Sequence, residues 1–223
     1  MKIGILASPA KQSAWMNKQT PAELFSWVQD SEAHENFDVF VDLDFDTHIE
    51  RIHHYAKNTQ TLFFLGAVKC NLEWAFQQNN LSLGNAQEAG CKMIGINNLC
   101  SFIERNALEY TNPMQVATAE VLVASTALGY PQIECVNSRV GLITPRVVCM
   151  IINEAFYTVQ EGTATEGDID QAMKLGTNYP MGPFEWCDKI GLADVYETLE
   201  ALYQDTHDER YKICSLLKQR YLR

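Results

Sequence analysis

The sequence has few of the features that mark exported, membrane-bound or disulfide-bonded proteins. No apolar stretch approaches the length that spans a bilayer. The run Ile3–Ala7 that follows Met1 and Lys2 is too short and too poorly flanked for a signal peptide. None of the seven cysteines belongs to a Cys-x-x-Cys pair, and their total is odd. We therefore expect a cytoplasmic protein with reduced, buried thiols.

Basic residues are also scarce. The chain has 28 acidic and 17 basic residues, a formal net charge of −11, and no run rich in Lys or Arg. Nucleic acids and anionic membranes are therefore not expected as partners. A phosphate-bearing ligand remains open, because a few local lysines or a helix N-terminus can bind phosphate on an acidic protein.

Patterns of metal ligands are missing as well. His48, His53 and His54 fall on one predicted helix, but no pair of them has the i, i+4 spacing of a helical metal site. We expect a polar helix face there and no metal site. No nucleophile–base pair and no P-loop stands out elsewhere in the chain.

The chain does have enough apolar residues, 47% of its 223, to bury the cores of two domains. Its first part alternates short apolar runs with amphipathic stretches, which is typical of a parallel sheet covered by helices. The runs predict strands over Lys2–Ala7, Asp38–Leu43, Thr61–Ala67 and Lys92–Ile96. The stretches predict helices over Pro21–Asp30, Asp46–Asn58 and Asn71–Gln78.

The pattern changes towards the C-terminus. A helix is predicted from Asn112 to Gly129, and Ile133–Val136 is the last predicted strand. From Arg146 onward the chain is predicted to be helical throughout, with starts at Thr165, Pro183, Leu192 and Ser215. We place the domain boundary at residue 139, which gives domains over residues 1–139 and 140–223.

The second domain carries a specific set of short motifs. They are Asn153-Glu154-Ala155, Glu161-Gly162, Asp168-Ile169-Asp170, Ala172-Met173, Gly176 and Tyr179–Glu185, followed by Gly191-Leu192. This set closely resembles the C-terminal domain of the L-3-hydroxyacyl-CoA dehydrogenase family. The resemblance implies an α/β chain: a reduced Rossmann-like parallel-sheet domain over residues 1–139, then an all-helical dimerisation domain over residues 140–223.

The first β–α turn departs from this family. A Rossmann turn needs glycines so that the backbone can approach the pyrophosphate, and the corresponding positions here are Ala7, Pro9 and Gln12. Phe37–Asp42 resembles the family's fourth strand, although only about thirty residues separate it from the first strand, too few for a full mononucleotide half. We therefore expect the strand that carries the ribose-binding acid to be deleted, and we expect no bound cofactor.

The resemblance also assigns the catalytic positions. Enzymes of this family use a histidine that removes the 3-hydroxyl proton, and a glutamate that orients it. Asn97 stands at the histidine position, and an amide cannot act as a general base near neutral pH. Glu109 is retained at the glutamate position, where it has no base to orient and could be a solvated side chain. Pro145 replaces an active-site asparagine.

Three functional hypotheses follow. The first is a dehydrogenase-like protein without NAD-dependent activity, with an acyl-CoA-sized cleft or an interaction role. The second is an active oxidoreductase that uses NAD to convert 3-hydroxyacyl-CoA to 3-oxoacyl-CoA in fatty-acid metabolism. The third is a structural partner of a full-length paralogue. A homodimer through the C-terminal helices is expected in addition, because the apolar stripe over Val147–Val159 is too wide for one small sheet domain to cover.

Overall fold

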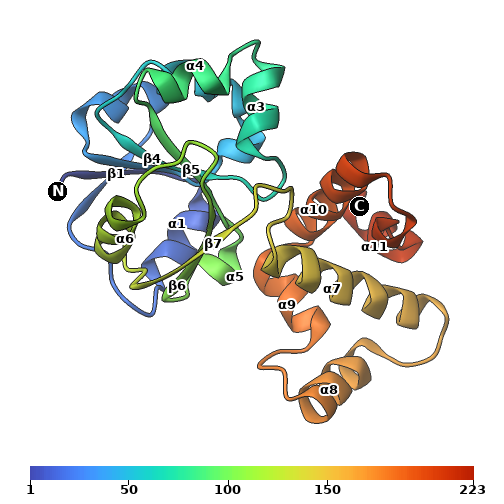
Figure 1. Cartoon of the computed structure of the whole chain (residues 1–223). Helices are drawn as coiled ribbons and strands as arrows, with labels where there is room; N and C mark the ends of the chain where they lie inside the picture. The colour runs from blue at the N-terminus through green and yellow to red at the C-terminus, as the bar shows by residue number, and fades with distance from the viewer. The chain divides into compact units, whose positions relative to one another are not determined.

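The computed structural model describes all residues, 1–223, and divides into two compact units, Met1–Leu142 and Ile143–Arg223. The first unit is a sheet with helices, and the second contains helices alone (Figure 1). This confirms the fold class predicted from the sequence, an α/β Rossmann-like domain followed by a helical domain.

The first unit is built on one seven-stranded sheet in the order β2-β1-β3-β4-β5-β6-β7. Strands β1 to β5 are parallel, β6 runs antiparallel to β5, and β7 is parallel to β6. The central strands β1, β3 and β4 are buried along their whole length, so they form continuous apolar runs. The seven strands are β1 (Ile3–Leu6), β2 (Phe25–Val28), β3 (Val39–Asp42), β4 (Leu62–Gly66), β5 (Lys92–Ile96), β6 (Ala107–Thr111) and β7 (Gln132–Val136).

Helices cover both faces of this sheet. Helices α3 and α4 lie on one face, and α1, α5 and α6 lie on the other (Figure 1). The helices are α1 (Pro9–Met16), α2 (Ile52–Tyr55), α3 (Leu72–Gln78), α4 (Leu83–Glu88), α5 (Cys100–Ile103) and α6 (Thr118–Ala127). Three 3-10 turns, Ser31–Asn36, Phe45–Thr47 and Ile49–Arg51, complete the unit.

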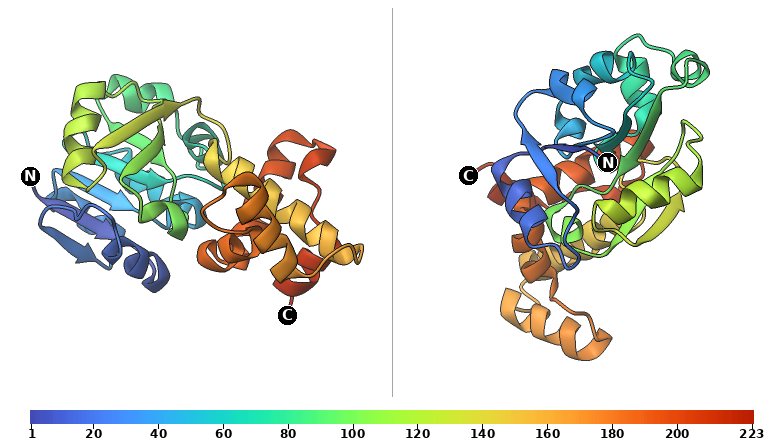
Figure 2. Two further views of the ribbon diagram at one scale, coloured as in Figure 1. Left: turned by 90° about the horizontal axis from the view of Figure 1, so that it is seen from below. Right: turned by 90° about the vertical axis from the view of Figure 1, so that its left-hand side faces the viewer.

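The helix predicted over Pro21–Asp30 is wrong. The segment contains β2, which lies at the edge of the sheet and pairs in parallel with β1 (Figure 2). Thr20 and Pro21 resemble a helix start, yet Phe25 and Val28 are half-buried against the first unit's core. The expected deletion of the strand that carries the ribose-binding acid is therefore wrong, because β2 lies next to β1 and is followed by Asp30.

Two other predicted helices are shorter than expected. Asp46–Asn58 forms the last two 3-10 turns and the single-turn helix α2. The helix expected from Asn112 begins only at Thr118. The Asn112 side chain donates to the carbonyl of Val116 at 2.8 Å and accepts from its N–H at 2.9 Å, which holds the intervening residues in a loop.

The second unit consists of α7 (Thr144–Gln160), α8 (Glu166–Thr177), α9 (Pro183–Ile190), α10 (Leu192–Thr206) and α11 (Ser215–Tyr221), with a 3-10 turn at Glu209–Tyr211. Helix α7 packs against α9, α10 and α11. The predicted start of α8 is confirmed as a reciprocal capping box between Thr165 and Asp168.

The apolar stripe of α7 is divided between two surroundings. Val148, Ile152 and Phe156 are buried in the unit's own core, and the Phe156 ring lies 4.9 Å from that of Phe184. Val147 is 51% exposed. The second unit therefore covers most of the stripe by itself and leaves its Val147 side open.

Candidate functional site

Polar side chains gather at the carboxyl edge of the parallel strands. Strands β1, β3, β4 and β5 end at one edge, and open α/β sheets bind their ligands there. Ser8 follows β1, Asp44 follows β3, and Asn97 and Asn98 follow β5. We take this edge as the candidate site.

The turn after β1 is joined to the end of β3. Ser8 precedes α1, and the Asp44 carboxylate accepts its backbone N–H at 2.5 Å and its hydroxyl at 3.0 Å. The buried ammonium of Lys11 lies 3.1 Å from the same carboxylate and donates to the carbonyl of Leu43 at 2.6 Å. Gln12 turns its amide back onto the carbonyl of Ala7 at 2.8 Å. The start of α1 thus already holds one carboxylate.

A second acid, Asp42, ends β3 and is fully buried. Both of its oxygens lie 3.1 Å from a guanidinium nitrogen of Arg51, and the hydroxyl of Tyr55 donates to one of them at 2.8 Å. Burial raises the pKa of Asp42, and Arg51 and Tyr55 only partly offset this. Because its hydrogen bonds are made within the chain, Asp42 supports β3 and does not point to a ligand.

A third acid bridges β3 to β5. The amide of Asn98 donates to Asp46 at 3.0 Å and to the carbonyl of Leu43 at 2.8 Å. Desolvation raises the pKa of Asp46, against the attraction of Lys11 and Lys69. A Cβ on Gly66 would lie 2.6 Å from the Asn98 amide nitrogen, so only glycine allows this contact.

The structure places Asn97 directly opposite Glu109. Ile96 pairs with Tyr110 in the antiparallel ladder, and the Asn97 N–H donates to the Glu109 carbonyl at 3.3 Å. Asn97 is 4% exposed, and its side-chain oxygen accepts the N–H of Leu99 at 3.3 Å. Glu109 is half-buried. The two positions assigned from the sequence thus lie side by side in the first unit.

Pro145 belongs to the second unit, where it occupies the first turn of α7 and is buried. Its neighbour Arg146 donates to the hydroxyl of Tyr211 at 2.8 Å. The guanidinium of Arg146 therefore helps to fix the 3-10 turn at Glu209–Tyr211 to α7.

The sequence did not bring Ser8, Lys11 and Asp44 together as one group. It also did not single out Asp30, which follows β2 at the place where a Rossmann domain carries its ribose-binding acid. Recognising β2 would have identified Asp30, whereas nothing in the sequence pairs Ser8 with Asp44, 36 residues away.

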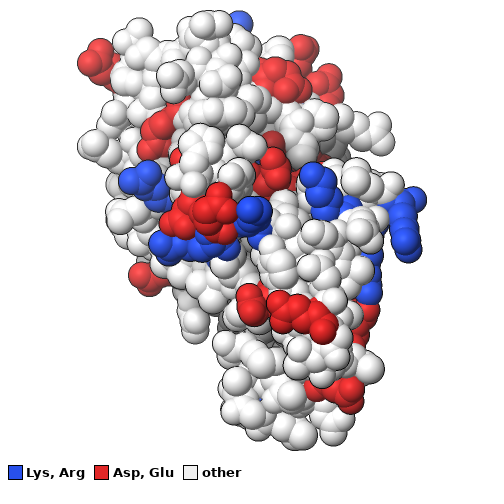
Figure 3. Space-filling view, turned by 90° about the vertical axis from the view of Figure 1, so that its right-hand side faces the viewer, with Lys and Arg blue, Asp and Glu red and all other residues white.

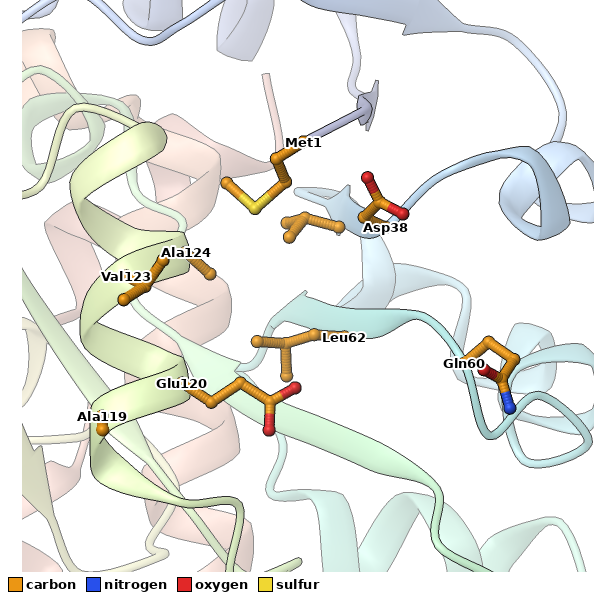
Figure 4. Close-up of a pocket in the computed structure, with 9 residues that line it drawn as sticks. Met1, Asp38, Gln60, Leu62, Ala119, Glu120, Val123 and Ala124 are labelled. Carbon is orange, nitrogen blue, oxygen red and sulfur yellow. The ribbon is translucent and has the colours of Figure 1, made fainter.

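A hollow of about 470 Å³ lies at the opposite edge of the sheet (Figure 4). Met1, Asp38 and Leu62, from the starts of the strands, line it together with Glu120 and Val123 of α6. Glu120 is bound to Lys92 at 2.8 Å. This hollow contains none of the residues assigned to catalysis or cofactor binding.

The surface carries both signs of charge. On the face in Figure 3, Lys and Arg side chains lie beside Asp and Glu. None of the helices is long and apolar enough to cross a bilayer. No group of three or more His, Cys, Asp or Glu side chains is arranged to hold a metal ion.

Comparison with known proteins identifies a family that the second unit resembles. Residues 141–222 match the model of the 3-hydroxyacyl-CoA dehydrogenase C-terminal domain. Escherichia coli 3-hydroxyadipyl-CoA dehydrogenase is 49% identical over 82 residues, which are 37% of this chain and 17% of that protein. A probable 3-hydroxybutyryl-CoA dehydrogenase from Bacillus subtilis is 39% identical over 100 residues, 45% of this chain and 34% of that protein. The chain thus matches about a third or less of these relatives' length.

A solved structure resembles nearly the whole chain. (S)-3-hydroxybutyryl-CoA dehydrogenase from Ralstonia eutropha superposes with a TM-score of 0.70 over 98% of this chain and 92% of that one, at 18% identity. At that identity the likeness shows a common fold for both units.

Proposed function

We propose that the chain is a dehydrogenase-like protein without NAD-dependent activity, because residues 141–222 match the model of the 3-hydroxyacyl-CoA dehydrogenase C-terminal domain. Its ligand would be an acyl-CoA thioester, the class of compound that appears in the names of its relatives. We also propose that it works in the cytoplasm, which agrees with its seven free cysteines.

The observation that carries this proposal is Asn97. It follows β5 and lies opposite Glu109, where the family resemblance implies a histidine base and its glutamate partner. The amide oxygen of Asn97 accepts a backbone N–H, and neither of its side-chain atoms takes up a proton near neutral pH. General acid–base catalysis typically contributes about 10²- to 10⁴-fold in rate, so its loss alone would leave a slow enzyme.

The first turn does not fit the family's cofactor either. Ala7, Pro9 and Gln12 stand where glycines would let the backbone approach a diphosphate, and Pro9 lacks the N–H that could bind it. Ser8 N–H is already bonded to Asp44. The proposal therefore does not include hydride transfer to a nicotinamide.

One observation favours a second candidate, the active oxidoreductase. Asp30 is exposed and follows β2, the strand beside β1, as the ribose-binding acid of a Rossmann domain does. Its carboxylate accepts the N–H of Glu32 at 2.9 Å, the contact of an ordinary N-cap. We rank this candidate second because the acid is retained without the turn that binds the phosphates.

The proposed assembly is a homodimer joined by the C-terminal helices. Val147 is 51% and Leu175 is 77% exposed, and Ile169 is the one buried residue of α8. Helix α8 lies at one end of the second unit and packs mainly on α9 (Figure 1). A helix with so little burial of its own needs a further surface, and a second copy offers the same patch.

Acetoacetyl-CoA reduction by NADH tests the proposal on the full chain. We expect no turnover above the uncatalysed rate. In calorimetric titrations we expect heat of binding for acetoacetyl-CoA and none for NADH. A reduction rate that disappears in Glu109→Gln would show that a working dyad has been rebuilt around Asn97, which would contradict the proposal.

A further inference from the structure

The start of α1 differs from the diphosphate-binding turn of a dinucleotide-binding domain. In a dinucleotide-binding domain the N–H groups at this helix start, together with the helix dipole, bind the diphosphate. In this chain the N–H and the hydroxyl of Ser8, the N-cap residue of α1, both donate to the carboxylate of Asp44. A negative group of the protein thus makes the contacts that a phosphate oxygen would make.

The positive charge of Lys11 balances the negative charge of Asp44. Lys11, on the first turns of α1, is 6% exposed and lies 3.1 Å from Asp44. Its ammonium also donates to the carbonyl of Leu43 and attracts the carboxylate of Asp46. Because Asp44 neutralises the Lys11 ammonium, a diphosphate at the start of α1 would meet the negative charge of the Asp44 carboxylate. Like charges repel more strongly at this partly buried place than in water.

We propose that Asp44 occupies the anion position of the first β–α turn and closes it to the phosphates of any nucleotide. The inference rests on the proposed function and adds a physical reason why a nucleotide does not bind. Asp44 stabilises the turn by capping α1 from β3, and the same contacts exclude the ligand that this turn binds in other Rossmann domains.

The test removes the carboxylate and offers the turn inorganic pyrophosphate. Asp44→Ala frees the Ser8 donors and removes the carboxylate that lies 3.1 Å from Lys11, and Asp44→Asn removes the charge while keeping the side-chain shape. We expect calorimetry to show pyrophosphate binding at least about tenfold tighter in both variants than in the unchanged chain. The negative charge of Asp44 no longer occupies the anion position, so pyrophosphate can take its place. The double variant Asp44→Ala/Lys11→Met should lose this gain.

The outcomes separate the inference from the proposed function. Folded variants that bind pyrophosphate no better than the unchanged chain would overturn the inference. So would a saturable shift of the Ser8 amide resonance when pyrophosphate is added to the unchanged chain, a measurement that needs no variant. Binding of NADH without any shift at Ser8 would instead contradict the proposed function and leave the closed turn standing.

Discussion

At the scale of single residues, Asp42 and Arg51 form an ion pair whose carboxylate is fully buried. Replacing Arg51 with Met leaves a fully buried carboxylate with only Tyr55 as a side-chain partner. We expect a loss of about 3 kcal/mol in the free energy of unfolding at pH 7, since breaking a buried pair uncovers an uncompensated charge. Burial already raises the pKa of Asp42, so the loss should shrink as the pH falls and the carboxyl becomes protonated in both proteins.

Urea unfolding at several pH values measures this loss. The matched control is the double variant Asp42→Asn/Arg51→Met, in which neither charge of this pair remains. It should recover most of the stability, and a double variant as unstable as Arg51→Met would show that Arg51 acts through packing and not through charge.

The Lys18 side chain is buried in an aromatic environment. Its Nζ lies 3.0 Å from the centroid of the Tyr130 ring and donates to the carbonyl of Ile103 at 3.1 Å, and burial lowers its pKa to about 6. Between that value and the ordinary 10.5 the unfolded chain binds more protons, so stability should rise with pH across this range. Lys18→Met should be more stable at pH 7 by on the order of 3 kcal/mol, with the difference vanishing near pH 10.

The substitution leaves no carbonyl unpaired, because the Tyr130 hydroxyl also donates to Ile103. Urea unfolding from pH 6 to pH 10 checks the prediction. A Lys18→Met variant that is less stable than the unchanged chain at pH 7 would show that the cation–π contact outweighs the cost of burial.

Among the site residues, Asn97 and Glu109 were assigned by the family resemblance, which implies a histidine and a glutamate at these positions. Strand β6 was not predicted, so the antiparallel pairing of β5 and β6 that places the two residues together is known only from the structure. The contact between Ser8 and Asp44 depends on two strands that become neighbours only in the folded sheet. Such a pairing has no local signal in one sequence.

At the scale of elements, the strands found from the sequence are mostly the fully buried ones. Strands β1, β3, β4 and β5 are apolar throughout or nearly so, and each was predicted. Strand β2 was missed because it is a short edge strand with exposed Ser26 and Trp27, behind a Thr20-Pro21 pair that imitates a helix start. Strand β6 was missed although Leu108 and Tyr110 alternate with less buried residues, a pattern that could have revealed it.

The hairpin of α8 and α9 explains one motif of the C-terminal domain. The Asp170 carboxylate on α8 accepts the N–H of Phe184 at 2.8 Å and that of Glu185 at 3.2 Å, so it caps α9 from the neighbouring helix. Asp170→Ala should lower the free energy of unfolding by about 1–2 kcal/mol, the usual cost of a lost N-cap. Gln171→Ala, an exposed neighbour on α8, should change it little, and thermal unfolding compares the two. Equal effects of both changes would refute the capping role.

At the scale of the whole molecule, the dimer can be tested on the exposed side of α7. Phe156 is unsuitable, because it is 1% exposed and its replacement would disturb the unit's own core. Val147→Asp/Ile151→Asp changes one exposed and one half-buried side chain and should leave the fold intact. Sedimentation should show a dimer for the unchanged chain and for Leu122→Asp, an exposed site on α6, and a monomer for the double variant. A monomeric unchanged chain would refute the assembly.

The proposed function, a dehydrogenase-like protein that binds no nicotinamide cofactor, draws on both units of the chain. The helical domain carries the family match, and the sheet domain carries Asn97 and the Ser8–Asp44 contact. Calorimetric titration of the full chain with NADH tests this most directly. We predict no measurable binding at micromolar concentrations, and a micromolar dissociation constant would contradict it.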